Sequence, residues 1–158
     1  MDRVADLLDE RELPNYLAEI GGELRLRGLN GKGQNWAIAI ETPDRTARSV
    51  HTVLHLTNTG LATSGDYRNY FEHNGNYFSH TIDPRTGRPV THNGASVTVV
   101  ADTAAFADAA ATALLVMGPE AGLALAERES IAAYFLLRLE SEFEERMSSL
   151  FAAEVLGR

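Results

Sequence analysis

The stretch of sequence that decides the fold is ASVTVVADTAAFADAAATALLVM, residues 95–117. Its first part, residues 95–100, is rich in β-branched residues and predicts a strand. Its second part, residues 103–117, is rich in alanine, the residue with the strongest intrinsic preference for helix. Thr103 or the aspartate before it can cap this helix, and the Gly-Pro pair that follows ends it. A strand followed directly by a helix indicates a protein that contains both kinds of element.

Outward from this stretch, the sequence predicts several more strands and helices. Alternating or short apolar runs predict strands, and the turn residues between some of them predict two hairpins, 23–29 with 35–41 and 67–72 with 77–82. Further strands are expected at 16–20, 51–56 and 131–137, and helices at 2–12, at 120–128 and in the tail 140–158, whose first part could instead form a strand. The expected fold is therefore α+β, an antiparallel β-sheet covered by helices, in a single domain over residues 1–158.

Composition narrows the class of protein. The chain has 158 residues, with 14 lysines and arginines against 22 acidic residues and a formal net charge of −8. Such a chain lacks the positive field that follows nucleic-acid phosphates, so we expect no nucleic-acid partner. It has no cysteine, which excludes disulfides, thiol nucleophiles and cysteine-ligated zinc. No run of about 18 apolar residues occurs and the opening residues lack a signal-peptide pattern, so we expect neither a membrane span nor an export address in the chain as given.

Two oxygen-bearing side chains of the alanine-rich helix form a candidate cation site. Asp108 and Thr112 are four residues apart, so a carboxylate and a hydroxyl share one face of the helix. Oxygen ligands of this kind suit Mg²⁺, with phosphates filling the remaining coordination positions. The alternative is a solvated aspartate and a threonine that hydrogen-bonds to its own helix. Side-chain chemistry alone leaves both interpretations open.

His80 is a candidate catalytic residue. The register of the second hairpin places it beside Phe78 and Ile82, on a face that we expect to point inward, where an imidazole needs partners. There it could act as a general base on a hydroxyl or stabilise a phosphate. The alternative is a structural histidine that fixes the following loop through Asp83 or a backbone carbonyl. These two interpretations also stay open at the level of residue chemistry.

Four motifs in a fixed order carry a resemblance to a known family. They are IGGE at 20–23, TSGDY at 63–67, SHTIDPRTG at 79–87 and ADAAAT at 107–112, the last followed by MGPE. In order and spacing they resemble the ApbE family, the FAD:protein FMN transferases. The resemblance extends from about residue 2 to about residue 133 and implies an ApbE-like, T-fold-like domain.

The resemblance implies an activity and roles for particular residues. The enzyme would be Mg²⁺-dependent, cleave the diphosphate of FAD and pass FMN to a threonine or serine hydroxyl of a partner flavoprotein, releasing AMP. Asp108 and Thr112 would hold the metal, and His80 would be the general base for the acceptor hydroxyl. The motifs also imply a set of substrate-binding residues: Gly21, Gly22, Glu23, Ser64, Gly65, Asp66, Asp83, Arg85, Thr86 and Gly87.

This sequence departs from the family pattern at its front. Family members carry a comparable length of sequence before the point that matches Asp2, so the chain is expected to lack the N-terminal half of the family's domain. Two alternatives to transfer therefore stay open. One is a Mg²⁺-dependent FAD pyrophosphatase, and the other is a non-catalytic half-domain that needs the missing part or forms a homodimer. The resemblance implies a redox-pump type of flavoprotein as the acceptor and the periplasmic side of the bacterial inner membrane as the location.

Overall fold

The computed structural model describes residues 1–44, 47–67, 70–73, 76–140 and 142–157. Its largest element is a six-stranded sheet in which every neighbouring pair is antiparallel, with the order β1-β2-β5-β10-β11-β12. These strands are β1 (Tyr16–Ile20), β2 (Glu23–Arg27), β5 (Gly60–Gly65), β10 (Gly94–Ala101), β11 (Ala132–Arg138) and β12 (Phe143–Met147). The prediction of an α+β fold built on an antiparallel sheet is confirmed.

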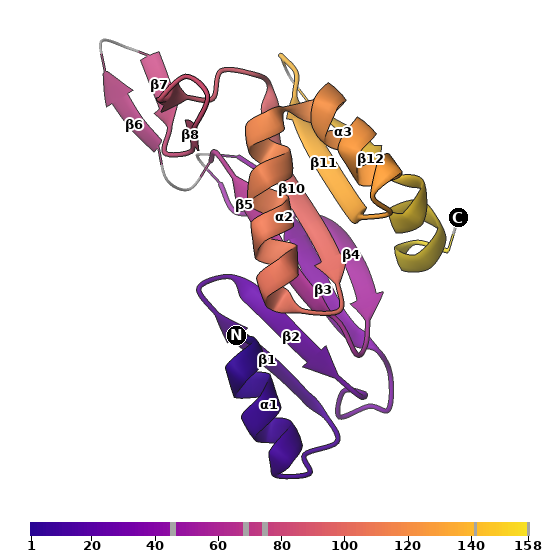
Figure 1. Ribbon diagram of the computed structural model, residues 1–158. Helices are drawn as coiled ribbons and strands as arrows, with labels where there is room; N and C mark the ends of the chain where they lie inside the picture. The colour runs from indigo at the N-terminus through magenta and orange to yellow at the C-terminus, as the bar shows by residue number, and fades with distance from the viewer. Residues whose placement is uncertain (45–46, 68–69, 74–75, 141, 158) are drawn as a thin grey trace.

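The two faces of this sheet are covered differently. The helices α2 (Ala104–Met117) and α3 (Pro119–Arg128) lie on one face, with α2 across β5 and β10 (Figure 1). A separate two-stranded ribbon, β3 (Trp36–Glu41) with β4 (Val50–Leu56), covers the other face together with the one-turn π-helix η1 (Phe151–Val155). The prediction of a cover made of helices therefore holds for one face, whereas strands supply most of the cover of the other.

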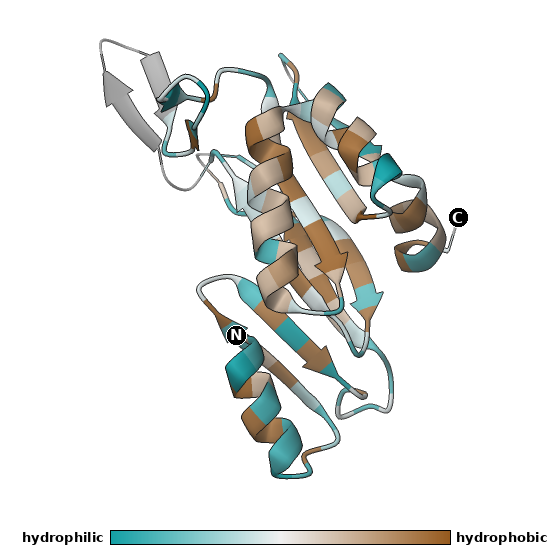
Figure 2. Cartoon of the chain, in the orientation of Figure 1, coloured by the Kyte–Doolittle hydropathy of each residue, from teal (hydrophilic) through white to brown (hydrophobic). Residues whose placement is uncertain are grey.

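Alternation along the strands produces two hydrophobic cores, one on each face of the sheet. Val97, Val99 and Phe135 are nearly inaccessible and pack against α2 and α3. Their neighbours Tyr134 and Leu136 point to the opposite face, where they pack against the ribbon and η1. Figure 2 shows that hydrophobic residues gather in the central strands and in α2. Each Å² of apolar surface that the two cores bury contributes about 25 cal/mol to the free energy of folding. This burial holds the ribbon and the helices against the sheet.

The start of α2 is fixed by two side chains. The hydroxyl of Thr103 accepts a hydrogen bond from the backbone N–H of Phe106, as the sequence predicts for a capping residue. The carboxylate of Asp2, from the first helix α1 (Asp2–Glu10), accepts the N–H groups of Ala104 and Ala105 at 3.0 and 2.8 Å. Burial raises the pKa of Asp2, but these hydrogen bonds and the nearby Arg25 outweigh it and lower the pKa. An acidic side chain at a helix N-terminus also interacts favourably with the helix dipole.

The predicted hairpin of residues 23–29 with 35–41 is wrong. β2 pairs with β1, in a register that leaves only Gly21 and Gly22 in the turn, and β3 pairs with β4 instead. Both glycines have positive φ, 72° and 106°, which a two-residue hairpin turn requires and which other residues rarely adopt. The Asn-Gly-Lys-Gly segment between the two runs is thus a connection from the sheet to the ribbon rather than a hairpin turn.

The second predicted hairpin is present, but it ends earlier than expected. β6 (Tyr70–His73) pairs with β7 (Asn76–Ser79), while the predicted turn residues Asn74 and Gly75 lie outside the described residues. Because β7 ends at Ser79, His80 lies beyond the strand and is exposed, so the prediction of a buried His80 on the hairpin strand is wrong. The chain continues through a short pair, β8 (Ile82–Asp83) with β9 (Arg88–Pro89).

Three further expectations concern the C-terminal part of the chain. The predicted strand at 131–137 and the predicted helix at 120–128 are confirmed as β11 and α3, and α3 begins at Pro119. The tail takes the alternative in which its first part pairs as a strand, since β12 lies beside β11. Within the described ranges, no helix has the length and apolar character that a membrane crossing requires.

Candidate functional site

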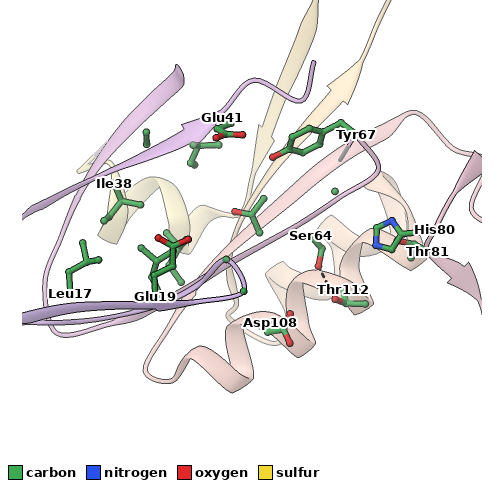
Figure 3. A pocket seen from close by; sticks show the side chains of 18 of the residues that line it. Leu17, Glu19, Ile38, Glu41, Ser64, Tyr67, His80, Thr81, Asp108 and Thr112 are labelled. Atoms are coloured by element: carbon green, nitrogen blue, oxygen red, sulfur yellow. Dashed lines mark hydrogen bonds between the residues drawn. The ribbon is translucent and has the colours of Figure 1, made fainter. Parts of the chain in front are cut away.

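A cavity of about 600 Å³ lies at an edge of the six-stranded sheet. Its walls come from the tip of the β1–β2 hairpin, from β3, from the end of β5 and from α2, with His80 and Thr81 at one side. Figure 3 shows these side chains arranged around one space. Seven residues that the sequence singled out line it: Gly21, Gly22, Ser64, Gly65, His80, Asp108 and Thr112.

The cavity exists because two neighbouring strands are staggered, so that β5 extends beyond the start of β2. β2 pairs with β5 only through Leu24 with Leu61 and Arg25 with Gly60. The Gly-Gly turn reverses the chain just before β2, so that among the described residues nothing pairs with this edge of β5 beyond Leu61. The last residues of β5 therefore border a space instead of another strand, and the hairpin tip lies at the same place.

Small residues on α2 bring its polar side chains to the cavity. Ala107 and Ala111 are completely buried against the sheet, and a methyl group lets the helix lie close to β5. Asp108 and Thr112 each follow one of these alanines in the sequence, so they project beside the buried stripe rather than into it. Both are exposed residues that line the cavity, as the predicted shared helix face requires.

A hydrogen bond joins the helix to the strand at the cavity wall. Ser64 Oγ lies 2.8 Å from Thr112 Oγ1, and either atom could be the donor. The register explains the contact: Ser64 pairs with Val97 and points to the α2 face, whereas Thr63 points to the opposite face and bonds to Thr98 at 2.8 Å. The two hydroxyl pairs therefore lie on opposite sides of β5, and only the first contacts α2.

The charges that line the cavity are mostly negative. Glu19, Glu41 and Asp108 contribute carboxylates. Of the described residues that line it, none is a lysine or arginine. A diphosphate placed here would meet like charges, which is unfavourable unless a cation lies between them.

Mg²⁺ fits the side chains that are present. It binds oxygen ligands, commonly through one or two carboxylates, and completes its octahedron with phosphate oxygens and water. Asp108 supplies a carboxylate and Thr112 a hydroxyl on the same helix face, both toward the cavity. Within the part of the chain that the structure describes, no group of three or more histidine, cysteine or acidic side chains forms a metal site by itself. This donor set fits a cation that is shared with a phosphorylated ligand.

Two of the predicted substrate-binding residues lie near the cavity without lining it. Asp66 is buried, and its carboxylate forms a bidentate ion pair with Arg138 at 2.9 and 3.0 Å, which ties the end of β5 to β11. Glu23 begins β2 just after the hairpin turn and is half-buried. The geometry of Asp66 is that of a structural ion pair, and a part for either residue in substrate binding stays a prediction.

The remaining four predicted residues form a self-contained loop, Asp83–Gly87. The Asp83 carboxylate accepts hydrogen bonds from the Nε, the Nη2 and the backbone N–H of Arg85, each 2.9 Å long. Thr86 and Gly87 donate their backbone N–H groups to the Asp83 carbonyl. The Arg85 guanidinium lowers the pKa of Asp83. These residues do not line the cavity, and their predicted role in substrate binding is not tested by this arrangement.

Sequence reasoning missed part of the cavity wall. Tyr67 and Thr81 line it and belong to the motifs but were not assigned a role, and Glu19 lines it directly before the first motif. The residues of β3 gave no such signal, because their contribution depends on where the ribbon crosses the sheet. Leu17 and Leu24 belong to the same group, since only the hairpin geometry brings them there.

An antiparallel sheet covered by helices on one face, with a cavity lined partly by carboxylates and hydroxyls at its open edge, defines the class: an α+β domain with a candidate ligand site beside the sheet. The chain belongs to the ApbE family, whose model matches residues 1–135. A relative from Haemophilus influenzae named FAD:protein FMN transferase is 46% identical over 152 residues, and one of the same name from Vibrio cholerae is 47% identical over 151. The recognition of the family from its motifs is confirmed.

Solved structures give the same result. The flavin transferase ApbE from Vibrio cholerae superposes with a TM-score of 0.83 at 44% identity, over 95% of this chain and 47% of that chain. The apo form of the Pseudomonas stutzeri flavinyl transferase ApbE gives 0.82 at 45% identity, over 96% of this chain and 46% of that chain. The two sequence relatives match 96% of this chain but only 44% and 45% of their own lengths. The chain thus spans less than half of the relatives it matches.

Proposed function

We propose that this chain supplies the cation site and the general base of a FAD:protein FMN transferase. The reaction would move FMN from FAD to a threonine or serine hydroxyl of a target flavoprotein and release AMP, with Mg²⁺ as the cofactor. The strongest support is the cavity itself: Asp108, Thr112 and His80 line one space that contains carboxylates and no lysine or arginine among its described residues. Such a space can hold a diphosphate only together with a cation.

The proposed chemistry uses few protein groups. Asp108 and Thr112 would hold Mg²⁺, which when bound neutralises charge on the diphosphate. His80 would accept the proton of the acceptor hydroxyl as its oxygen attacks the phosphorus of the FMN unit. The new bond joins that oxygen to phosphorus, and the bond that breaks joins the same phosphorus to the bridging oxygen, which leaves with AMP. The exposed position of His80 suits this role, because the acceptor is itself a protein that must reach the site.

The test is attachment of FMN to a target protein. The chain is incubated with FAD, Mg²⁺ and an acceptor flavoprotein domain, and the intact mass of the acceptor is measured. We expect FMN attachment that is lost in His80→Ala and Asp108→Asn and kept in Asp102→Asn, a matched change at an exposed aspartate outside the cavity. Release of free FMN without attachment would instead support a pyrophosphatase, in which water replaces the acceptor hydroxyl.

A second candidate is a half-domain that needs another polypeptide segment to complete its cavity. Two observations favour it: the chain spans less than half of its relatives, and the cavity borders strand edges that lack a partner among the described residues. From Ala37 to Ile40, β3 lines the cavity and pairs only with β4. An unpaired, uncharged strand edge of this kind readily accepts another strand. The segment could come from a second copy or from the part of the family's domain that the chain does not match. If the chain alone neither binds FAD nor attaches FMN, this candidate replaces the first.

A further inference from the structure

We propose that Ser64 is a positioning residue for Thr112: its Oγ accepts the hydroxyl hydrogen of Thr112, so that the lone pairs of Thr112 face the cavity. The sequence resemblance implied a different role, direct binding of substrate. The cation that Thr112 would ligate belongs to the proposed function, and this inference rests on it to that extent. The orientation of Thr112 itself is a property of this chain and can be measured without any ligand.

The hydroxyls of Ser64 and Thr112 lie within hydrogen-bond distance of each other. Ser64 Oγ and Thr112 Oγ1 are 2.8 Å apart, the usual length of a hydrogen bond between two hydroxyls. One partner belongs to the central sheet and the other to α2, and the completely buried Ala111 next to Thr112 holds the helix close to β5. Both residues line the cavity. Figure 3 shows the hydrogen bond between them and Asp108 on the same helix as Thr112.

The inventory of hydrogens shows what the proposed direction of the bond leaves free. A hydroxyl has one hydrogen and two lone pairs. A helical threonine commonly donates its hydrogen to a carbonyl of the preceding turn, which turns its oxygen toward the helix. An acceptor on β5 competes with that carbonyl. When Thr112 donates to Ser64, its lone pairs remain for a cation in the cavity.

The opposite face of β5 offers a matched control. Thr63 and Thr98 form a second hydroxyl pair of the same length, 2.8 Å, on the face turned away from α2. Thr98 is buried and does not line the cavity, whereas its partner Thr63 does, so this control also releases a hydroxyl of the cavity wall. Thr98→Val therefore removes an interstrand hydroxyl contact without touching Thr112, whereas Ser64→Ala removes the contact under study.

The experiment measures two quantities in the unchanged chain, Ser64→Ala and Thr98→Val. The first is the three-bond NMR coupling to the Thr112 methyl group, which reports its χ1 angle. We expect one rotamer in the unchanged chain and in Thr98→Val, and an average over rotamers in Ser64→Ala. The second is the affinity for Mn²⁺ in the presence of FAD, measured by electron paramagnetic resonance. We expect it to fall about 10-fold in Ser64→Ala, the size of effect typical for a residue that orients a metal ligand.

A double variant tests whether Ser64 acts through Thr112. In a Thr112→Ala background, Ser64→Ala is expected to change Mn²⁺ affinity less than twofold, because the hydroxyl that it orients is gone. An unaltered Thr112 coupling in Ser64→Ala, or Mn²⁺ binding as tight as in the unchanged chain, overturns the positioning role and leaves the proposed function standing. If the unchanged chain binds no Mn²⁺ with FAD, the proposed function fails, and this inference fails with it.

Discussion

Two regions of the molecule carry the most distinctive motifs, and they use their polar atoms in opposite ways. At the cavity wall, Ser64, Asp108 and Thr112 point into a shared space from a strand and a helix. In the Asp83–Gly87 loop, the carboxylate is already occupied by Arg85, and the backbone closes on itself. The difference teaches that two equally distinctive motifs can differ in what their polar atoms face: those of one border an open cavity, and those of the other hydrogen-bond within their own loop. The loop is adjacent to the cavity through His80 and Thr81, yet its own polar groups are satisfied internally.

The largest expected effect comes from the carboxylate of the cavity wall. In Asp108→Asn the charge that would hold the cation is lost, and FMN transfer is expected to fall by about 10² to 10³-fold, a typical loss for a group that stabilises transition-state charge. Asp108 is exposed, so the unfolding transition should hardly move. Transfer is measured by acceptor mass and stability by urea denaturation. If the folded Asp108→Asn variant transferred FMN as well as the unchanged chain, Asp108 would have no part in the reaction, and the cavity wall and the loop would no longer differ in function.

The second prediction concerns the close packing behind the cavity wall. A Cβ at position 65 would lie 2.6 Å from Cε1 of Tyr67 and 3.1 Å from the Ala95 carbonyl oxygen. Gly65→Ala is therefore expected to lower the free energy of unfolding by about 1–3 kcal/mol, the usual cost of overpacking. Gly31→Ala is the control, because nothing lies within 4 Å of its added Cβ. In a Tyr67→Ala background the cost of Gly65→Ala should shrink, and an undiminished cost there would show that the ring is not the obstacle.

The third prediction concerns the cap that fixes α2 and therefore the cavity wall. Asp2→Ala leaves the N–H groups of Ala104 and Ala105 without their acceptor and should cost about 1 kcal/mol at pH 7. Because the pKa of Asp2 is lowered in the folded chain, its contribution is present above the pKa of the unfolded aspartate, about 4, and is lost as the pH falls through the folded value.

The measurement is urea denaturation of both proteins between pH 7 and pH 3. The gap in stability between the unchanged chain and Asp2→Ala should narrow below about pH 4. The matched control is Asp6→Ala on the same helix, since Asp6 forms only an exposed ion pair with Arg3 in the described structure. A gap that is constant over the whole range would mean that Asp2 does not act through its charge.

The smallest effect is expected in the loop. Arg85→Ala removes an exposed partner of Asp83, and FMN transfer is expected to fall less than about fivefold, in line with the small free energies of exposed ion pairs. The acceptor-mass assay used for Asp108→Asn gives a direct comparison. A loss as large as that of Asp108→Asn would show that Arg85 binds substrate in the working protein, as the family resemblance implies, and the two regions would then form one site.

The sequence predicted the elements of this fold better than their pairing. The helix ending at Met117, its capping Thr103, the strand before it and the helix after it were predictable because each depends on local preference and periodicity. The hairpin of 23–29 with 35–41 was mispredicted because glycine-containing segments lie on both sides of residues 23–29. The chain could have reversed at Gly21-Gly22 before them or at residues 30–33 after them, and it reverses at Gly21-Gly22. The choice between them depends on which surface the Trp36–Glu41 strand buries, and no local rule contains that information.

For the candidate site, too, some features followed from the sequence and others only from the tertiary structure. By itself, the sequence determined the family, the helix face shared by Asp108 and Thr112, and the motifs around Ser64 and His80, because residue types and short spacings are enough for these. Only the tertiary structure decided that His80 is exposed, that Asp66 is tied to Arg138, and that Ser64 bonds to Thr112. Such contacts join residues far apart in the chain, and they exist because the buried alanines of α2 and the short hairpin tip leave an open, oxygen-lined edge on the sheet.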